Sequence, residues 1–421
     1  MASIPANELA REVLDACLQE GTWPTRALDD LIERALDEDD LFRATAATRA
    51  LFAILIERLG DLFEPALCDI YARLFAHVIS RALPEYDAAA LLTRYRRVRQ
   101  VRKFQGGEVL RVFVLSRVTL GADVAVTSVA LSAAKERFPD AEICLVGPEK
   151  NAELFSADPR IVPVSLLYGR SSLLRERLLA AAELLVAVDE PNSIVIDPDS
   201  RLTQLGLLPL GDDDARYYFF ESRAYGGELE VSLPRLTAEW LGEVFDTPHA
   251  KAYVAPPRQP RIADVTVSWG VGDNEQKRVN GDFEYDILAA LLGKGRQVLI
   301  DRGGGGEEAD RIDRVVRRLG APPNLHVHNG SYASFASHIS QSRLYVGYDS
   351  AGQHVAAASG VPLISVFKGY ACPRMLSRWK PDSPDAHVIV VKESDTPNDV
   401  LNATLHAISE AAVGVSGAST G

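Results

Sequence analysis

Cysteine and long apolar runs are scarce in this chain of 421 residues. The four cysteines, Cys17, Cys68, Cys144 and Cys372, stand far apart, with neither CxxC spacing nor a compact disulfide pattern, so we expect reduced and mostly buried thiols. No segment approaches the roughly 20 uncharged apolar residues of a membrane span. The stretch MASIPANELAREVLDACLQE also lacks the apolar core of a signal peptide, and we therefore expect a cytoplasmic location.

The chain also lacks a net positive charge. The net charge of −13 repels phosphate backbones, which excludes nucleic acid as a partner. The one basic stretch, RYRRVRQVRK from Arg94 to Lys103, leaves room for a peripheral membrane contact, but a solvated helix face or a contact at a domain junction is favoured. Length and an ordinary hydrophobic fraction of 47% indicate two or three globular domains, each large enough for an enzyme.

The chain divides into three parts by pattern. Up to about residue 106, apolar residues recur at helical spacing, as from Leu41 to Leu59, and we expect four or five helices separated at Pro24, Asp40 and Pro84. This predicts an all-α domain over residues 1–106.

Two α/β series follow the helices. Short β-branched runs, LRVFVLS, ICLVG, LLVAVD and IVIDP, alternate with helix-length segments, and a second such series starts after the proline-rich segment Pro256–Pro260. The alternation predicts parallel sheets in two Rossmann-like domains, over residues 107–255 and 256–421, with the prolines as the hinge.

The stretch YVGYDSAGQHVAAASG, from Tyr345 to Gly360, carries the first candidate site. A strand is expected to end there, and a small-residue helix follows a loop with few bulky side chains. Its candidate residues are Asp349, Ser350, Ala351, Gly352 and His354. Since a helix amino terminus at the end of a parallel strand binds phosphate, a phosphate site is as plausible as simple helix capping by Asp349 and Ser350.

A second candidate lies at the first strand-to-helix turn of the middle domain, in VLSRVTLGADVAVTSVALSAAKERFP. Gly121 is expected to permit a tight turn, and Asp123 would project from the strand end, where a carboxylate serves as a general base. On this turn alone, a helix cap is favoured for Asp123. The G-x-G-x-x-G fingerprint is absent, so dinucleotide binding is not indicated.

Together these stretches resemble the heptosyltransferases of glycosyltransferase family 9. The family's first turn, S-x-x-G-D-x-x-x-T-T-P-A-L, is matched by Gly121, Asp123, Thr127, Ser128, Ala130 and Leu131, although Ala122 intervenes and Val129 replaces a proline. The later phrase D-[ST]-G-P-x-H-x-A-A-A-x-G-x-P is matched by Asp349, Ser350, His354, Ala356, Ala357, Ala358, Gly360 and Pro362, with Ala351 and Gly352 in place of Gly and Pro. A third phrase, SWGVGDNEQKRV, puts Lys277 at the position of the donor-phosphate lysine, followed by Arg278.

The resemblance covers about Val109 to Ser409 and implies the GT-B fold. It implies an inverting glycosyltransferase that moves a heptose-like or other hexose sugar from a nucleotide-diphosphate donor to a glycan, lipid or protein acceptor. Asp123 would be the base. Lys277, Arg278 and the backbone around Ser350 would balance the diphosphate, so that no metal and no cofactor are implied.

Other features are assigned to structure. The glycines of Gly303–Gly306 are expected in a flexible loop near the nucleoside, and the acidic strings Asp197–Asp199 and Asp212–Asp214 are interpreted as loop carboxylates. His326 and His328 share one strand face and are not favoured as metal ligands. The candidate residues for the acceptor side are Arg201, Gln204, Tyr217 and Arg223.

Two other functions stay open. The first is a non-catalytic protein that binds a nucleotide sugar on the same scaffold, with the helical domain recruiting a partner. The second is a nucleotide-sugar 2-epimerase, for which the cleft has few acidic and histidine side chains.

Overall fold

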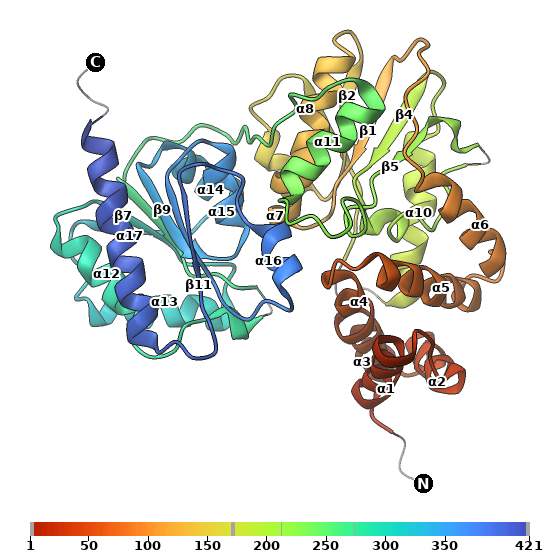
Figure 1. Ribbon diagram of the computed structural model, residues 1–421, viewed down its shortest axis with the longest axis horizontal. Helices are drawn as coiled ribbons and strands as arrows, with labels where there is room; N and C mark the ends of the chain where they lie inside the picture. Colours follow the sequence, from red (N-terminus) through yellow and green to blue (C-terminus); the bar gives the residue numbers. More distant parts are fainter. Residues whose placement is uncertain (1–3, 170–172, 212, 273, 418–421) are drawn as a thin grey trace. The chain divides into compact units, whose positions relative to one another are not determined.

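The computed structural model describes residues 4–169, 173–211, 213–272 and 274–417. It separates into two compact units (Figure 1). The first comprises Met1–Thr119, Val129–Glu149 and Arg160–Ala250, and the second comprises Leu120–Ser128, Lys150–Pro159 and Lys251–Gly421. We describe each unit by itself.

The first unit begins with helices. These are α1 (Ala6–Glu20), α2 (Thr25–Ala35), α3 (Leu41–Arg49), a π-helical segment (Ala50–Ile56), α4 (Glu57–Asp61), α5 (Pro65–Ala82) and α6 (Ala88–Val98). Since α3, the π segment and α4 are continuous, residues 4–106 hold five helical segments, as predicted. Asp40 caps α3 by accepting a hydrogen bond from the Arg43 N–H at 3.0 Å, and Pro24 precedes α2.

A parallel sheet of five strands follows in the same unit. The strands are β1 (Arg111–Leu115), β2 (Glu142–Gly147), β3 (Ile161–Ser165), β4 (Ser193–Asp197) and β5 (Tyr217–Phe219), in the order β3-β2-β1-β4-β5. The helices among and after them are α8 (Ser128–Arg137), α10 (Leu174–Val188) and α11 (Leu233–Phe245), while α9 (Glu149–Ala152) belongs to the second unit except for its first residue. The predicted strand LLVAVD is wrong, because these residues complete α10, whose apolar face is buried.

The N-terminal helices and this sheet share one apolar core. It runs from Leu28 and Phe75 in the helices to Phe113 and Val195 in the strands, all of which are buried. A separate all-α domain is therefore not confirmed, and the division at residues 106 and 255 stays a proposal. The basic stretch also belongs to this packing, since Arg94 pairs with Asp214 at 2.8 Å and Arg99 pairs with Glu221 at 2.8 Å.

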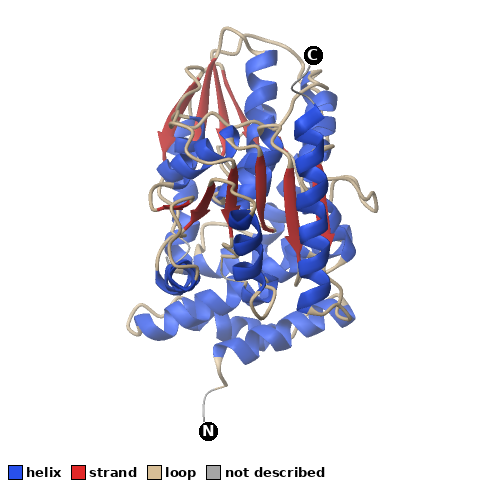
Figure 2. Cartoon of the chain, turned by 90° about the vertical axis from the view of Figure 1, so that its left-hand side faces the viewer, coloured by secondary structure: helices blue, strands red, loops and turns tan. Residues whose placement is uncertain are grey.

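The second unit contains a parallel sheet of six strands. They are β6 (Val265–Ser268), β7 (Val298–Asp301), β8 (Leu325–His328), β9 (Leu344–Tyr348), β10 (Leu363–Phe367) and β11 (Ala386–Val390), in the order β11-β10-β9-β6-β7-β8. Its helices are α12 (Phe283–Gly293), α13 (Gly306–Arg318), α14 (Tyr332–Gln341), α15 (Ala351–Ala358), α16 (Pro373–Trp379) and α17 (Pro397–Gly417). Figure 2 shows strands in red between blue helices, which is the doubly wound arrangement predicted for such βα alternation.

Two short segments from the middle of the chain pack with the second unit. They contain α7 (Leu120–Ala122), a π-helical segment (Asp123–Thr127) and a 3-10 turn (Glu153–Phe155). The π-helical segment and α7 contact α15, and the 3-10 turn contacts α14. This places Gly121, Asp123 and Thr127 in the same unit as the candidate phosphate site.

Candidate functional site

The six-stranded sheet has a point at which its winding reverses. The chain runs from β6 through β7 to β8 at one edge and then returns to β9, which pairs with β6 on its other side. In open parallel sheets, ligands bind beyond the carboxyl ends of the strands at such a reversal. The site is therefore expected after Ser268 in β6 and after Tyr348 in β9.

Lys277 and Asp349 meet at this place, although they come from motifs 72 residues apart. Lys277 ends a 3-10 turn (Glu275–Lys277) that follows β6, and Asp349 follows β9. The Lys277 ammonium lies 2.7 Å from a carboxylate oxygen of Asp349 and 3.1 Å from its backbone carbonyl. The two side chains are only 17% and 10% exposed, so the pair is held in a largely desolvated position.

Arg278 follows Lys277 at the end of the 3-10 turn and is a second cation of this segment. Its side chain is 17% exposed and lies 3.6 Å from Glu275, while its Nε is buried and has no hydrogen-bond partner within the described residues. Burial raises the pKa of Glu284, and Arg311 and Arg278 oppose that rise. Arg278 is thus a buried donor that is incompletely satisfied by the protein, as expected of a group that binds an anion.

The amino terminus of α15 opens at the same point. Ser350 occupies the N-cap position, but within the described residues its side chain makes no capping hydrogen bond. Asp349 does not cap the helix either through the contacts described, because its carboxylate accepts from Lys277 and, at 2.7 Å, from the Gln353 side chain. The capping interpretation of these two residues is therefore not supported, and the N–H groups of the first turn suit an anion.

Gly352 has a steric reason to be glycine. A Cβ atom at this position would lie 2.2 Å from the hydroxyl oxygen of Tyr345, and one at Gly347 would lie 2.4 Å from the same oxygen. Tyr345 is fully buried in β9, with its hydroxyl between the two glycines. The tyrosine thus explains why glycine replaces the proline of the family phrase.

Gln353 is a site residue that sequence reasoning missed. Its side chain is fully buried, and it donates to Asp349 and to the Trp379 carbonyl (3.2 Å) while accepting from the Ser365 hydroxyl (2.6 Å). These bonds fix the orientation of the Asp349 carboxylate. The available signal was the i, i+4 spacing of Asp349 and Gln353, although no pattern pointed to Ser365 or Trp379.

His354 lies one residue further along α15 and is nearly fully buried. Burial lowers the pKa of His354 to about 4, with Asp349 raising it and Lys277 lowering it by smaller amounts. The imidazole is therefore neutral near pH 7, and its ring lies edge-on to Trp379 with centroids 5.8 Å apart. His354 can act as a hydrogen-bonding group there but not as a cation.

Gly121 lies in α7 and not in the tight turn that was predicted. The residue with a left-handed backbone is Val118, at φ 59°. A Cβ at Gly121 would approach the Ala351 Cα to 3.3 Å and the His354 ring to 3.5 Å. The glycine therefore permits close contact between α7 and the first turn of α15.

Asp123 begins the π-helical segment and is completely buried. One carboxylate oxygen accepts from the Thr127 hydroxyl at 2.6 Å, and the other accepts from the Asn151 side-chain amide. A π-helical turn accommodates one extra residue in a helix, which matches the extra Ala122 of this chain relative to the family phrase. Thr127 thus fixes the aspartate, and Asn151 is a partner that the sequence did not indicate.

The residues assigned to the acceptor side lie in the first unit and are mostly internal. The Tyr217 hydroxyl donates to Asp197 at 2.6 Å, Arg223 pairs with Asp199 at 2.6 Å, and Gln204 is fully buried. Arg201 and Arg223 are partly buried. Lining an open acceptor surface is therefore wrong for Tyr217 and Gln204, which are buried, and Arg223 is engaged by Asp199.

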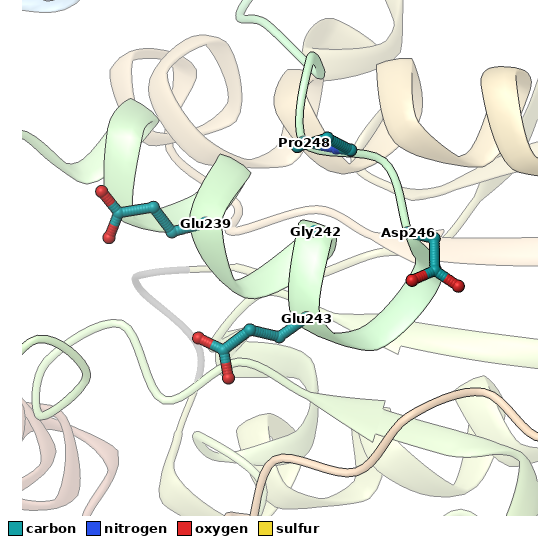
Figure 3. Close-up of a pocket in the computed structure, with 5 residues that line it drawn as sticks. All are labelled: Glu239, Gly242, Glu243, Asp246 and Pro248. Carbon is teal, nitrogen blue, oxygen red and sulfur yellow. The ribbon is translucent and has the colours of Figure 1, made fainter.

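Other candidate sites are less suited to a phosphate. The pocket of about 590 Å³ along α11 in Figure 3 is lined by Glu239, Gly242, Glu243, Asp246 and Pro248, so its carboxylates would repel an anion. Across the described ranges, no three His, Cys, Asp or Glu side chains group as metal ligands. His328 instead lies 3.2 Å from Asp301. Of the acidic string Asp212–Asp214, Asp212 lies outside the described residues.

No helix in the described part of the chain is both long and apolar enough to cross a membrane. The four cysteines are free, and three are buried while Cys372 is partly exposed, as predicted.

No protein-family model matches the chain, and no curated protein matches it by sequence. Solved structures do match by fold. The chain is similar to the E. coli heptosyltransferase WaaC solved with ADP, at 15% identity over 72% of this chain and 99% of that one, with a TM-score of 0.54. It is also similar to the E. coli ADP-heptose lps heptosyltransferase II (17%, 71% and 99%, TM-score 0.51) and to a family 9 glycosyl transferase from Veillonella parvula (15%, 72% and 98%, TM-score 0.51). The chain thus has the heptosyltransferase-like GT-B fold that its motifs predict.

Proposed function

We propose that the protein is an inverting glycosyltransferase that uses a nucleotide-diphosphate sugar. The observation that carries the proposal is the position of Lys277 beside Asp349 and the uncapped amino terminus of α15, where the second sheet reverses its winding. Fold alone does not define activity, so the proposal depends on these side chains. The similar WaaC structure, which was solved with ADP, supports a nucleoside diphosphate as the ligand.

In this proposal, Lys277 and Arg278 stabilise the negative charge that develops on the departing nucleoside diphosphate. The N–H groups at the start of α15 and the helix dipole would act on the same charge, which makes the reaction independent of a metal ion. Removing one such group typically raises the barrier by roughly 2 to 4 kcal/mol. Gln353 would keep Asp349, and through it Lys277, in place.

Asp123 is the proposed base that takes the proton of the acceptor hydroxyl. One carboxylate oxygen accepts from Thr127 and the other from Asn151, and a carboxylate oxygen has a second lone pair that can accept the acceptor hydroxyl. Because Asp123 is completely buried, acceptor binding has to expose it. Asp123→Asn is expected to abolish transfer while ADP binding, measured by calorimetry, persists. Unchanged turnover would remove Asp123 from this role.

The donor sugar is proposed to be a heptose or a hexose. The acceptor is proposed to be a glycan, a lipid or a protein. We further propose that the enzyme works in the cytoplasm, which free cysteines support because disulfides are rare there. A peripheral membrane contact through the basic stretch has less support, because Arg94, Arg97 and Arg99 pair with acidic residues of the first unit.

A thermal-shift panel of ADP, GDP, UDP and dTDP tests the proposed function. A ligand that binds only the folded state raises the melting temperature, so one nucleotide should stabilise the wild type clearly more than Lys277→Ala. Lys294→Ala is the matched control, because Lys294 is exposed at the end of α12 and donates to the Ser409 hydroxyl at 3.3 Å, away from β6 and β9 in the sequence. Slow release of nucleoside diphosphate from the matching nucleotide sugar would then separate an enzyme from a protein that only binds the donor.

A further inference from the structure

Lys368 directly follows β10 and contacts the turn that carries Lys277. Its ammonium donates to the backbone carbonyl of Gln276 at 3.1 Å and to that of Arg278 at 2.7 Å. These are the residues immediately before and after Lys277. One side chain from the end of β10 thus holds the backbone on both sides of the proposed phosphate lysine.

The backbone of the next residue, Gly369, packs closely against the same turn. It has a left-handed conformation at φ 68°, and a Cβ atom there would lie 2.9 Å from the carbonyl carbon and oxygen of Gln276. Both the conformation and the space require glycine. Lys368 and Gly369 therefore form one clamp on the Gln276–Arg278 backbone.

The turn has little regular structure of its own. Among the described residues between β6 and α12, regular structure is limited to the three-residue 3-10 turn Glu275–Lys277, which Asn274 caps by accepting from the Gln276 N–H at 3.1 Å. Hydrogen bonds from a charged donor are about twice as strong as those between neutral groups, so the Lys368 ammonium is suited to fix two carbonyls. The clamp aims the Lys277 side chain at Asp349 and the start of α15.

We propose that Lys368 is a positioning residue of the nucleoside-diphosphate site and acts through Lys277. This inference rests on the proposed function. We assign Lys368 to the turn and not to the anion itself, since the two hydrogen bonds described for it go to backbone carbonyls. Its removal should free the turn and misplace Lys277 without changing the fold of the sheet.

A double-mutant cycle tests the proposal in the full chain, with ADP as the probe. Lys368→Met keeps the aliphatic stem and removes the donor, and it should weaken ADP binding about tenfold, which corresponds to roughly 1.4 kcal/mol. In the Lys277→Ala background, the same change should weaken binding less than twofold, because residues that act as a unit are not additive. Lys368→Arg should restore most of the affinity, and Lys294→Met is the control for loss of one positive charge.

The outcomes separate this inference from the proposed function. ADP binding that is insensitive to Lys277→Ala would overturn both. Binding that is weakened in Lys277→Ala but unchanged in Lys368→Met would overturn only the clamp, as would a full tenfold effect of Lys368→Met in the Lys277→Ala background.

Hydrogen exchange of the ligand-free protein gives a second measurement that needs no nucleotide. The backbone of residues 275–278 should exchange faster in Lys368→Met and in Gly369→Ala than in the wild type, while strands β6 and β9 keep their protection. Equal exchange of this turn in wild type and Lys368→Met would contradict the proposed positioning role.

Discussion

The two sheets have the same winding, but different side chains occupy the points at which the winding reverses. In the first unit, the reversal lies between β1 and β4, and buried polar groups fill it: the Ser200 hydroxyl donates to the Ser116 carbonyl, and Arg117 donates to the Pro198 carbonyl at 3.1 Å. In the second unit, the reversal between β6 and β9 carries Lys277 and an uncapped helix. Topology offers two crevices, and side chains decide which one can bind an anion.

The N-terminal helices account for the difference. Gly60 lies so close to Arg223 that a Cβ there would be 2.6 Å from its Nε. The remaining cavity between the helices and the end of the sheet is about 10 Å³, lined by Gly60, Cys68, Tyr71, Tyr95, Asp199, Leu205, Glu221 and Arg223. A cavity of this volume holds about one water molecule. The helices thus close the first crevice and make it part of the core.

The largest expected loss of stability comes from removing a charged side chain that fills the closed crevice of the first unit. Arg223→Met leaves Asp199 buried, with Arg117 at 3.8 Å as its remaining cation among the ion pairs described. Loss of one partner of a buried pair should lower the free energy of unfolding by about 3 to 5 kcal/mol, measured by chemical denaturation. Arg175→Met is the control, because its pair with Glu38 is exposed and worth less than about 1 kcal/mol. Equal losses of unfolding free energy in the two variants would show that the buried pair of Arg223 with Asp199 does not stabilise the fold.

A smaller loss of stability is expected from a substitution at the crevice of the second unit, between β6 and β9. Gly352→Ala would push a Cβ into Tyr345 and should destabilise the protein by about 1 to 3 kcal/mol. Tyr345→Val vacates the space at the cost of its own cavity, so in that background the added Gly352→Ala should cost much less than it does in the wild type. Gly293→Ala in α12 has no atom within 4 Å of the added methyl and serves as the control. An equal cost of Gly352→Ala in the two backgrounds would mean that Tyr345 does not explain the glycine.

The pH dependence of stability should have opposite signs in the two crevices. Burial raises the pKa of Glu221 to about 7, against the opposing effects of Arg99 and Tyr95. The folded state therefore keeps a proton that the unfolded state loses between about pH 4.5 and 7, and stability falls as pH rises through that range. Glu221→Gln should remove this fall in the denaturation midpoint.

His354 should act in the other direction. Its pKa is about 4 in the folded state, and that of an unperturbed histidine is about 6.5, so the unfolded state binds the proton first as pH is lowered. Stability should therefore be lost as pH falls from 6.5 towards 4. His354→Gln should reduce that loss, and a loss that is unchanged in this variant would contradict the buried neutral ring.

Much of the second unit was predictable from sequence. The runs QVLID and LYVGYD and the helix FEYDILAALLG lie where the structure has β7, β9 and α12, since each has a clear period. The family resemblance implied that Lys277 and the start of α15 serve one diphosphate, but the ion pair of Lys277 with Asp349 was not predicted.

The errors have physical causes. LLVAVD was interpreted as a strand because a short apolar run does not distinguish a strand from a buried helix. Asn151 and Lys368 were missed because their partners are distant in sequence, and Lys368 contacts backbone carbonyls, which carry no sequence signal. Gln353 was missed although Asp349 is only four residues away, because its other partners, Ser365 and Trp379, follow no pattern. The acceptor residues were misplaced because no pattern shows that the N-terminal helices cover Arg223.

Hydrogen exchange with and without a saturating nucleoside diphosphate is the most direct test of the contrast between the two crevices. The nucleotide used is the one that gives the largest thermal shift with the wild-type protein. New protection is expected at residues 275–278 and 349–354, and not at residues 116–118 or 198–205. Protection confined to the first unit, with the start of α15 unchanged, would contradict the account.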